Sequence, residues 1–164
     1  MRVPALILAL WAIDTCRAGD FNQKTQVTFA APVEIPGQAL PAGTYIFKLI
    51  DSSTTNRIVQ VFDQNETHLF ATFLTVPDYR MKPADQTVVL FEERPSDTPE
   101  AIKALFCHGD QYARLFVYPH EAALAIARRT HQKVLQMRDD HKVGGVDESG
   151  QPIDLKDVVP SKPK

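Results

Sequence analysis

Hydrophobic and polar residues alternate along most of this chain, as they do in β-strands. The clearest case is residues 43–51, where Tyr45, Phe47 and Leu49 fall on one face and the intervening residues on the other. A Leu-Pro-Ala-Gly segment precedes this stretch. Its proline and glycine supply the backbone dihedrals that a tight turn into the strand needs. The pattern predicts a strand on which the rest of the domain is built.

Further alternating stretches follow, separated by short polar breaks or by Pro and Gly. Residues 69–76 are apolar on both faces, which indicates a central strand. We predict an all-β fold, an antiparallel β-sandwich or a partly closed β-barrel of about seven or eight strands with one C-terminal helix. The other predicted strands are 24–30, 33–35, 58–63, 87–94, 101–107 and 114–118.

The helical period appears after these strands, in residues 119–131. Ala123, Ile126 and Ala127 fall at i, i+3 and i+4, and Pro119 suits the first helical position. Residues 133–136 are compatible with a short returning strand. The β domain is therefore expected to cover residues 19–136, with its helix at 119–131.

From Met137 onward the composition changes to charged residues, Gly144-Gly145 and three prolines. Few large apolar residues remain to offset the chain entropy. Residues 137–164 are predicted to form a mobile polar tail.

The first eighteen residues have the layout of a signal peptide. Arg2 is followed by an apolar run from Val3 to Ile13, and small residues at 16 and 18 precede Gly19. The run is shorter than the roughly 20 residues of a membrane span. We expect a secreted or periplasmic protein; the alternatives are a lipid anchor on Cys16 and a buried N-terminal element.

Net charge and cysteine content restrict the partners and the disulfides that can be expected. The 164-residue chain has a formal net charge of −2, which gives no reason to expect nucleic acid as a partner. Cleavage after Ala18 would leave Cys107 as the single cysteine, so no internal disulfide is expected. Cys107 ends an apolar run and is interpreted as a small core residue rather than a reactive thiol.

Several segments, taken together, resemble an uncharacterised family of small exported bacterial β-domain proteins. The resemblance covers about residues 21–136. It implies export and a β domain, and it brings no established activity, cofactor or catalytic residue. The segments are LPAGTY at 40–45, VQVFD at 59–63, ATFL at 71–74, PDYR at 77–80, FEERP at 91–95 and FVYP at 116–119.

Two clusters of charged and aromatic residues near strand ends supply the candidate ligand-binding residues Tyr79, Arg80, Glu92 and Arg94. In a functional interpretation, Glu92 or Glu93 is a general acid or base and an arginine holds an anionic substrate. The alternative is ion pairing that orders the loop after residue 77. Adjacent carboxylates in a strand point to opposite faces, which favours the structural role. The tyrosines at 45, 79, 112 and 118 offer either a sugar- or peptide-binding surface or core packing.

Local motifs for metals, phosphates or nucleophilic catalysis are absent from the sequence, and no cofactor is predicted. The five histidines are scattered in the sequence. A metal site would have to be assembled from distant strands, for example from His108 with Asp110 and His120. We expect an exported non-enzymatic β-sandwich module with a binding or structural role in the cell envelope, its partner an unknown protein or envelope ligand. The alternative is a hydrolase using Glu92 or Glu93 with His108 or His120, and a third possibility is a small-molecule carrier.

Overall fold

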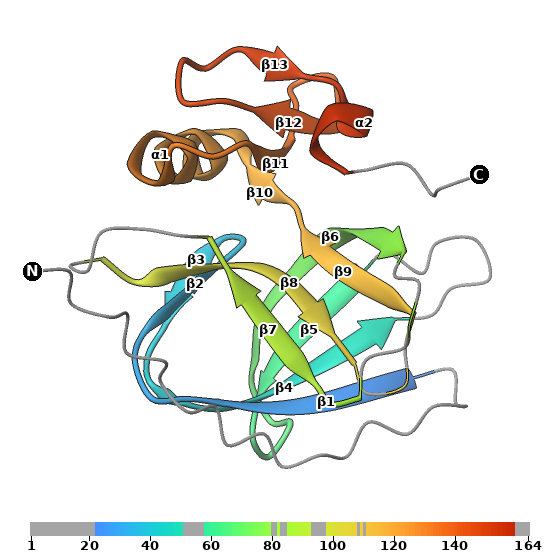
Figure 1. Ribbon diagram of the computed structural model, residues 1–164. Helices are drawn as coiled ribbons and strands as arrows, with labels where there is room; N and C mark the ends of the chain where they lie inside the picture. The colour runs from blue at the N-terminus through green and yellow to red at the C-terminus, as the bar shows by residue number, and fades with distance from the viewer. Residues whose placement is uncertain are drawn as a thin grey trace, which may run out of the picture.

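The computed structural model describes residues 22–50, 58–79, 82, 85–92, 98–107, 109 and 111–159. Within these residues nine strands form one large sheet, and four further strands form a second (Figure 1). The large sheet contains β1 (Asn22–Phe29), β2 (Val33–Ile35), β3 (Gln38–Leu40), β4 (Gly43–Ile50), β5 (Ile58–Asp63), β6 (Leu69–Tyr79), β7 (Val88–Phe91), β8 (Glu100–Phe106) and β9 (Tyr112–Phe116).

The strand predicted at residues 43–51 is confirmed as β4, which lies between β1 and β5. Both pairings are antiparallel, with Phe47 opposite Thr25 on one side and opposite Val61 on the other. The order of the sheet is β1-β4-β5-β6-β9-β8-β2-β3, and β7 pairs with β8. The contact of β2 with β8 is parallel, so the sheet is mixed rather than wholly antiparallel.

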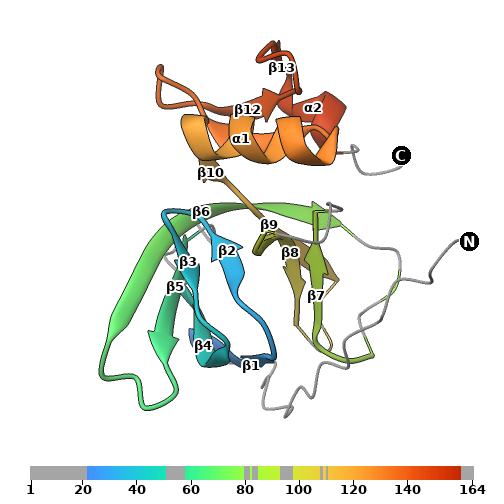
Figure 2. The same cartoon turned by 90° about the vertical axis from the view of Figure 1, so that its left-hand side faces the viewer.

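Strand β6 joins the two layers of the sheet. Its residues 69–74 pair with β5, and its residues 75–79 pair with β9. Figure 2 shows β6 arching over the fold from one layer to the other. The sequence predicted a strand ending at Val76, but Pro77 continues in β6 opposite Arg114. We call residues 22–116 the sandwich, because the sheet folds over itself without closing into a barrel.

The core of the sandwich is aromatic. Phe47 and Phe73 approach Phe116 with ring centroids 6.3 and 4.7 Å apart. Phe29 contacts Phe47 and, across the layers, Phe91. Offset or edge-on ring pairs at these spacings stabilise the core beyond the contribution of burial.

The predicted all-β fold is confirmed, and the described residues form more strands than the seven or eight expected.

The predicted helix is present as α1 (His120–Thr130), with Ala123, Ile126 and Ala127 buried. It connects β10 (Tyr118–Pro119) to β11 (Val134–Met137), which pair in parallel. Glu121 in its first turn and Arg128 and Arg129 in its last turn carry the charges that the helix dipole favours.

Residues 138–159 differ from the predicted mobile tail. They form β12 (Val143–Val146), β13 (Pro152–Ile153) and the single-turn helix α2 (Leu155–Val158). We call residues 118–159 the C-terminal unit. The physical reason for the difference is packing against the sandwich: Val143, Leu155, Val158 and Val159 are part of one apolar cluster with Val76, Phe106 and Leu115.

Tyr118 fastens the C-terminal unit to the sandwich. Its side chain is buried, and its hydroxyl lies 2.8 Å from the carbonyl oxygen of Ile102 and 3.0 Å from that of Glu34. The carboxylate of Glu34 also accepts a hydrogen bond from the Arg129 guanidinium on α1. Strands β2 and β8 are thus tied to β10 and α1.

The predicted signal peptide, residues 1–18, lies outside the described residues. No helix in the described part of the chain is both long enough and apolar enough to cross a membrane.

Candidate functional site

A pocket of about 470 Å³ lies between the sandwich and the C-terminal unit. Small-molecule sites usually enclose about 300–1,000 Å³, so this volume is sufficient for a small ligand. Its walls come from both parts of the protein. The lining residues are Asp78, Glu92, Lys103, Leu115, Phe116, Gln132, Lys133, Leu135, Asp157 and Val158.

The sandwich contributes three charged residues to the pocket. Asp78 comes from the second half of β6, Lys103 from β8, and Glu92 from the residue just after β7. The Glu92 N–H donates to the carbonyl oxygen of Ala101 at 2.9 Å, which continues the β7–β8 ladder and fixes the position of the glutamate. Successive side chains of a strand point to opposite faces of the sheet, so the pairing of β7 with β8 determines which of their side chains face the pocket.

Glu92 is 4% exposed although it carries a carboxyl group. The Nζ atom of Lys103 lies 3.6 Å from its Oε2 atom, and the lysine side chain is 42% exposed. A buried carboxylate needs such a compensating charge, because leaving it unpaired in a poorly solvated site is costly. The pair places a negative charge on the inner wall and its ammonium partner nearer to solvent.

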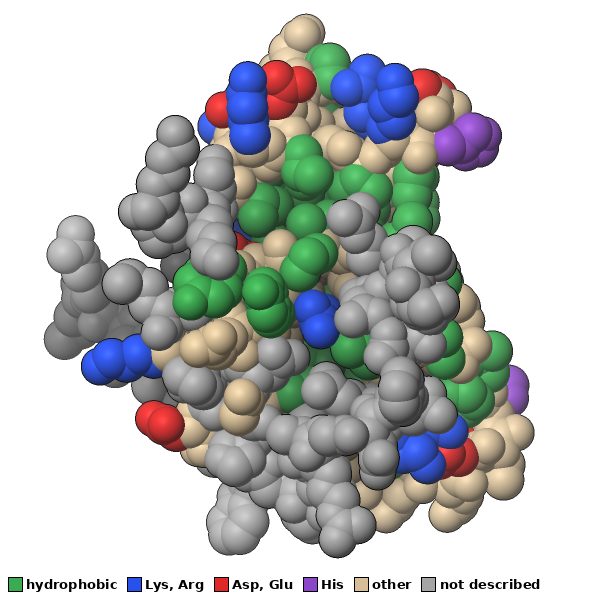
Figure 3. Space-filling view, turned by 90° about the vertical axis from the view of Figure 1, so that its right-hand side faces the viewer, with side chains coloured by type: hydrophobic (Ala, Val, Ile, Leu, Met, Phe, Trp, Pro, Cys, Tyr) green, Lys and Arg blue, Asp and Glu red, His purple; other side chains and the backbone are tan. Residues whose placement is uncertain are grey.

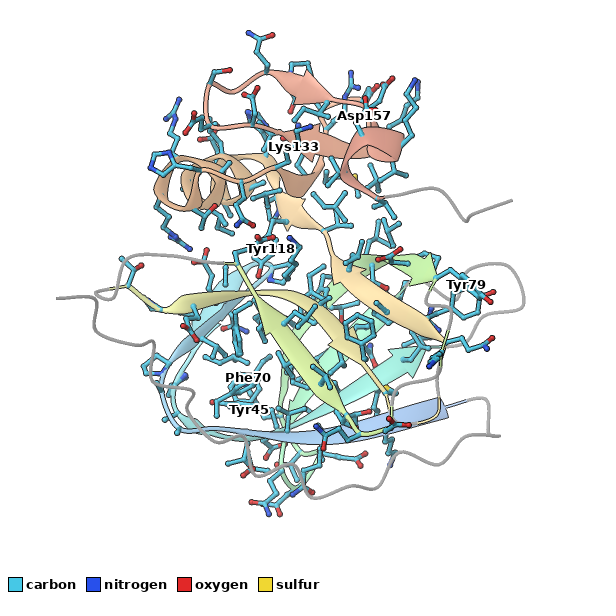
Figure 4. All side chains as sticks on the ribbon, in the orientation of Figure 1. Tyr45, Phe70, Tyr79, Tyr118, Lys133 and Asp157 are labelled. Carbon is cyan, nitrogen blue, oxygen red and sulfur yellow. The ribbon has the colours of Figure 1, made fainter. Side chains whose placement is uncertain are left out.

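The C-terminal unit contributes one residue of each charge, Lys133 and Asp157. Lys133 follows α1 just before β11, and Asp157 is on α2; both are exposed. Among the described residues neither side chain makes an ion pair or a hydrogen bond. Figure 4 labels both residues on the C-terminal unit.

Apolar side chains complete the pocket. Leu115 on β9 and Leu135 on β11 are buried, and Val158 on α2 is partly buried. All three belong to the apolar cluster that joins the two parts of the protein. Figure 3 shows hydrophobic side chains gathered in the band below the charged side chains of the C-terminal unit. The site therefore combines an apolar wall with a few fixed charges.

The four candidate residues from the sequence occupy different places. Glu92 lines the pocket, together with Asp78 from the other predicted cluster. Tyr79 ends β6 and does not line the pocket. Arg80 and Arg94 lie outside the described residues, as does Glu93.

Tyr79 forms an edge-to-face pair with Tyr112, their ring centroids 5.6 Å apart. Tyr112 is 42% exposed, so one ring of this pair is accessible at the end of β6, where Figure 4 labels Tyr79. Tyr45 and Tyr118, in contrast, are buried in the core. Burial raises the pKa of the Tyr45 hydroxyl above its ordinary value.

The histidines do not converge in the described part of the chain. The Nδ1 atom of His120 is 2.5 Å from Oε1 of Gln136, and the buried Gln136 donates to the carbonyl oxygen of Gly145 at 2.9 Å. His108 and Asp110, the other members of the predicted metal set, lie outside the described residues. Within those that are described, no group of three or more His, Cys, Asp or Glu side chains is arranged to hold a metal ion.

Cys107 is 7% exposed, and its Sγ atom lies 3.1 Å from the Thr25 hydroxyl on β1. This position matches the interpretation of Cys107 as a small core residue.

No family model, curated protein or solved structure matches this chain. The geometry of the pocket is accordingly the basis for assigning a function.

Sequence reasoning missed Lys103, Lys133 and Asp157 as site residues. Lys133 lies near the end of the expected domain and Asp157 lies beyond it, and Lys103 is an isolated charge in a strand. The available signal was the apolar spacing of Val143, Val146, Leu155 and Val158, which the abundance of Gly, Pro and charged residues obscured.

Proposed function

We propose that this protein is an exported, non-enzymatic β-sandwich module that binds a small ligand in the pocket between the sandwich and the C-terminal unit. The observation that carries the proposal is the pocket itself: about 470 Å³, with an apolar wall and charged residues from both parts of the protein. Concave, largely apolar sites with a few placed polar groups are the usual form of small-molecule sites. Export rests on the signal-like pattern of residues 1–18 and on the family resemblance.

A binding role is favoured over nucleophilic catalysis by the composition of the pocket. None of its ten lining residues among those described is a Ser, Thr, Cys, His or Tyr. A nucleophile and an adjacent base within hydrogen-bond reach are the usual requirements of that chemistry. The composition therefore disfavours a hydroxyl, thiol or imidazole nucleophile.

The test is a thermal-shift screen of the chain from Gly19 to Lys164 against amino acids, sugars, peptidoglycan fragments and lipids. A ligand that binds only the folded state raises the apparent stability, by about 2.7 kcal/mol at one hundred times its Kd. Gln132→Trp places a large side chain in the pocket wall and should abolish the shift. Gln151→Trp, at an exposed position in the β12–β13 turn, is the matched control and should retain it.

Two results would contradict the proposal. One is the absence of any shift across the screen, and the other is a shift that survives Gln132→Trp.

The hydrolase alternative keeps one supporting observation, the burial of Glu92 in the pocket wall. A carboxyl group in such a place is a candidate general acid or base. His120 does not line the pocket and is engaged with Gln136, so Glu92 would act without it. Conversion of a bound ligand to product by the unmodified protein, lost in a folded Glu92→Gln variant, would favour the hydrolase over the binding module.

A further inference from the structure

The two charged residues that the C-terminal unit brings to the pocket are available to a ligand. Lys133 and Asp157 are exposed, and neither side chain is paired with another described residue. Several other charged side chains of this unit are paired; for example, Lys142 and Arg138 both approach Asp140, and Lys156 approaches Asp154. An ammonium and a carboxylate at one pocket are thus left for an external partner.

We propose that the pocket binds a small zwitterion with an apolar body, a free amino acid or a dipeptide, with Lys133 on its carboxylate and Asp157 on its ammonium. This inference rests on the proposed function, since it names the ligand of the same pocket. At pH 7 both ends of a peptide are predominantly charged, because the ordinary pKa values of its terminal carboxyl and amino groups are about 3.5 and 7.8.

The charge balance of the pocket favours a zwitterion over a simple anion or cation. Three carboxylates (Asp78, Glu92 and Asp157) and two ammonium groups (Lys103 and Lys133) line it. Lys103 and Glu92 largely compensate each other at 3.6 Å. Asp78 also interacts with another residue of the protein. Lys133 and Asp157 are then one charge of each sign, so a purely anionic ligand would be repelled by Asp157 and a purely cationic ligand by Lys133.

The apolar wall accounts for the body of the ligand. Leu115, Leu135 and Val158 present branched aliphatic side chains from three different elements. Burying an aliphatic side chain against such a wall stabilises binding in proportion to the apolar area removed from water. Leucine and leucyl-leucine are therefore suitable probes, and comparing them distinguishes a free amino acid from a dipeptide.

The experiment is isothermal titration of the Gly19–Lys164 chain with leucine, leucyl-leucine, N-acetyl-leucyl-leucine and leucyl-leucine amide. The zwitterionic forms should bind, and blocking either end should weaken binding by about threefold to tenfold, the range for ligand charges that are partly exposed. Lys133→Gln should weaken the zwitterion and the N-acetyl compound but leave the amide unchanged. Asp157→Asn should weaken the zwitterion and the amide but leave the N-acetyl compound unchanged.

Lys142→Gln and Asp139→Asn are the matched controls, because they remove one charge of each sign from exposed positions that do not line the pocket. Both should bind leucyl-leucine as the unmodified protein does. The melting temperature of each variant establishes that it is folded.

The inference would be overturned if neither zwitterion binds, if the blocked compounds bind equally well, or if the two variants do not discriminate between the blocked ends. The proposed function would survive such a result if another compound of the screen shifts the melting temperature and Gln132→Trp removes that shift. The two failures are therefore distinguishable.

Discussion

At the scale of single residues, Tyr118 holds the C-terminal unit to the sandwich. It is 1% exposed, and its hydroxyl reaches the carbonyl oxygens of Glu34 on β2 and Ile102 on β8. Burial, together with the nearby carboxylates of Glu34 and Glu92, raises the pKa of the Tyr118 hydroxyl well above its ordinary value. The hydroxyl therefore remains a proton donor throughout the physiological pH range.

Tyr118→Phe removes that donor and should reduce the free energy of unfolding by about 1–2 kcal/mol, because buried carbonyl groups lose a partner. Tyr45→Phe is the comparison, since the Tyr45 hydroxyl donates to a single acceptor, the carbonyl oxygen of Pro41, at a less buried site. Its loss should be smaller. Urea denaturation of both variants measures the difference, and equal stabilities would contradict the anchoring role.

Asp147 organises the turn between β12 and β13. Its carboxylate accepts hydrogen bonds from the Ser149 hydroxyl at 2.6 Å and from the Ser149 and Gln151 N–H groups at 2.9 Å each. The Ser149 hydroxyl and then the Gln151 N–H lower the pKa of Asp147 below its ordinary value of 3.8. A carboxylate stabilised in this way contributes to folding while it remains ionised.

Because the pKa of Asp147 is lower in the folded state than in the unfolded chain, its contribution is complete above about pH 4 and disappears as the pH falls through the folded-state value. Asp147→Asn should therefore lower the melting temperature at pH 7, and the difference from the unmodified protein should shrink towards pH 2. Differential scanning calorimetry across this range checks the prediction. A difference that is independent of pH would indicate that the carboxylate charge is not involved.

At the scale of elements, Gly144 and Gly145 explain how a segment rich in small and charged residues can pack. A Cβ atom on Gly145 would lie far inside van der Waals contact with Val158 and 3.3 Å from the Cβ atom of Ile153. On Gly144 it would lie 3.2 Å from the carbonyl oxygen of Ile153. These glycines allow α2 and β13 to approach β12 closely, and the approach brings Asp157 and Val158 to the pocket.

Gly145→Ala should therefore displace α2 and destabilise the protein by about 1–3 kcal/mol, as overpacking of a tight contact does. Gly43→Ala is the matched control: Gly43 is also in a strand, and an added Cβ atom would meet only the Tyr45 ring at ordinary contact distances of 3.5 Å or more. It should be neutral or slightly stabilising. Chemical denaturation distinguishes the two, and equal effects would show that the approach of α2 is not tight.

The elements that alternate or repeat clearly could be predicted from the sequence. The strand at β4, the central position of β6 and the helix α1 follow from periods of 2 and 3.6 residues, which depend only on local faces. The short strands β3, β12 and β13 could not be predicted in this way. Unlike the equally short β2, whose sequence is Val-Glu-Ile, their sequences Gln-Ala-Leu, Val-Gly-Gly-Val and Pro-Ile show no alternation of apolar and polar residues.

The candidate site was harder to predict than the fold. Glu92 stood out as one of a run of charges at a strand end, but its partner Lys103 is brought to it by the pairing of β7 with β8. Lys133 and Asp157 meet the sandwich through contacts between segments far apart in the sequence. Such long-range contacts leave no local pattern in the sequence. The two glycines that permit these contacts contributed instead to a composition typical of a mobile tail.

At the scale of the whole molecule, the C-terminal unit covers an apolar face of the sandwich. Val76, Ala104 and Leu115 of the sandwich lie in one cluster with Leu135, Leu155 and Val158 of that unit. Removing the chain after Gln136 would take away α2 and β12 and expose this face to water.

A chain from Gly19 to Gln136 should therefore melt at a lower temperature than the chain from Gly19 to Lys164, and it should bind a dye specific for exposed apolar surface. For each 25 Å² of apolar area that the truncation exposes, the free energy of unfolding should fall by about 0.6 kcal/mol. Scanning fluorimetry of the two chains tests this prediction. Identical melting temperatures would mean that residues 137–164 contribute nothing to the fold.

The two-layer path of β6 also has a consequence for local opening. Its residues 69–74 and 75–79 are hydrogen-bonded to different strands, yet they form one continuous backbone segment. Because the two layers share this segment, we predict that they open together, as a single cooperative unit. In native-state hydrogen exchange, amides paired along β5 and those paired along β9 should then share the same opening free energy and the same dependence on denaturant.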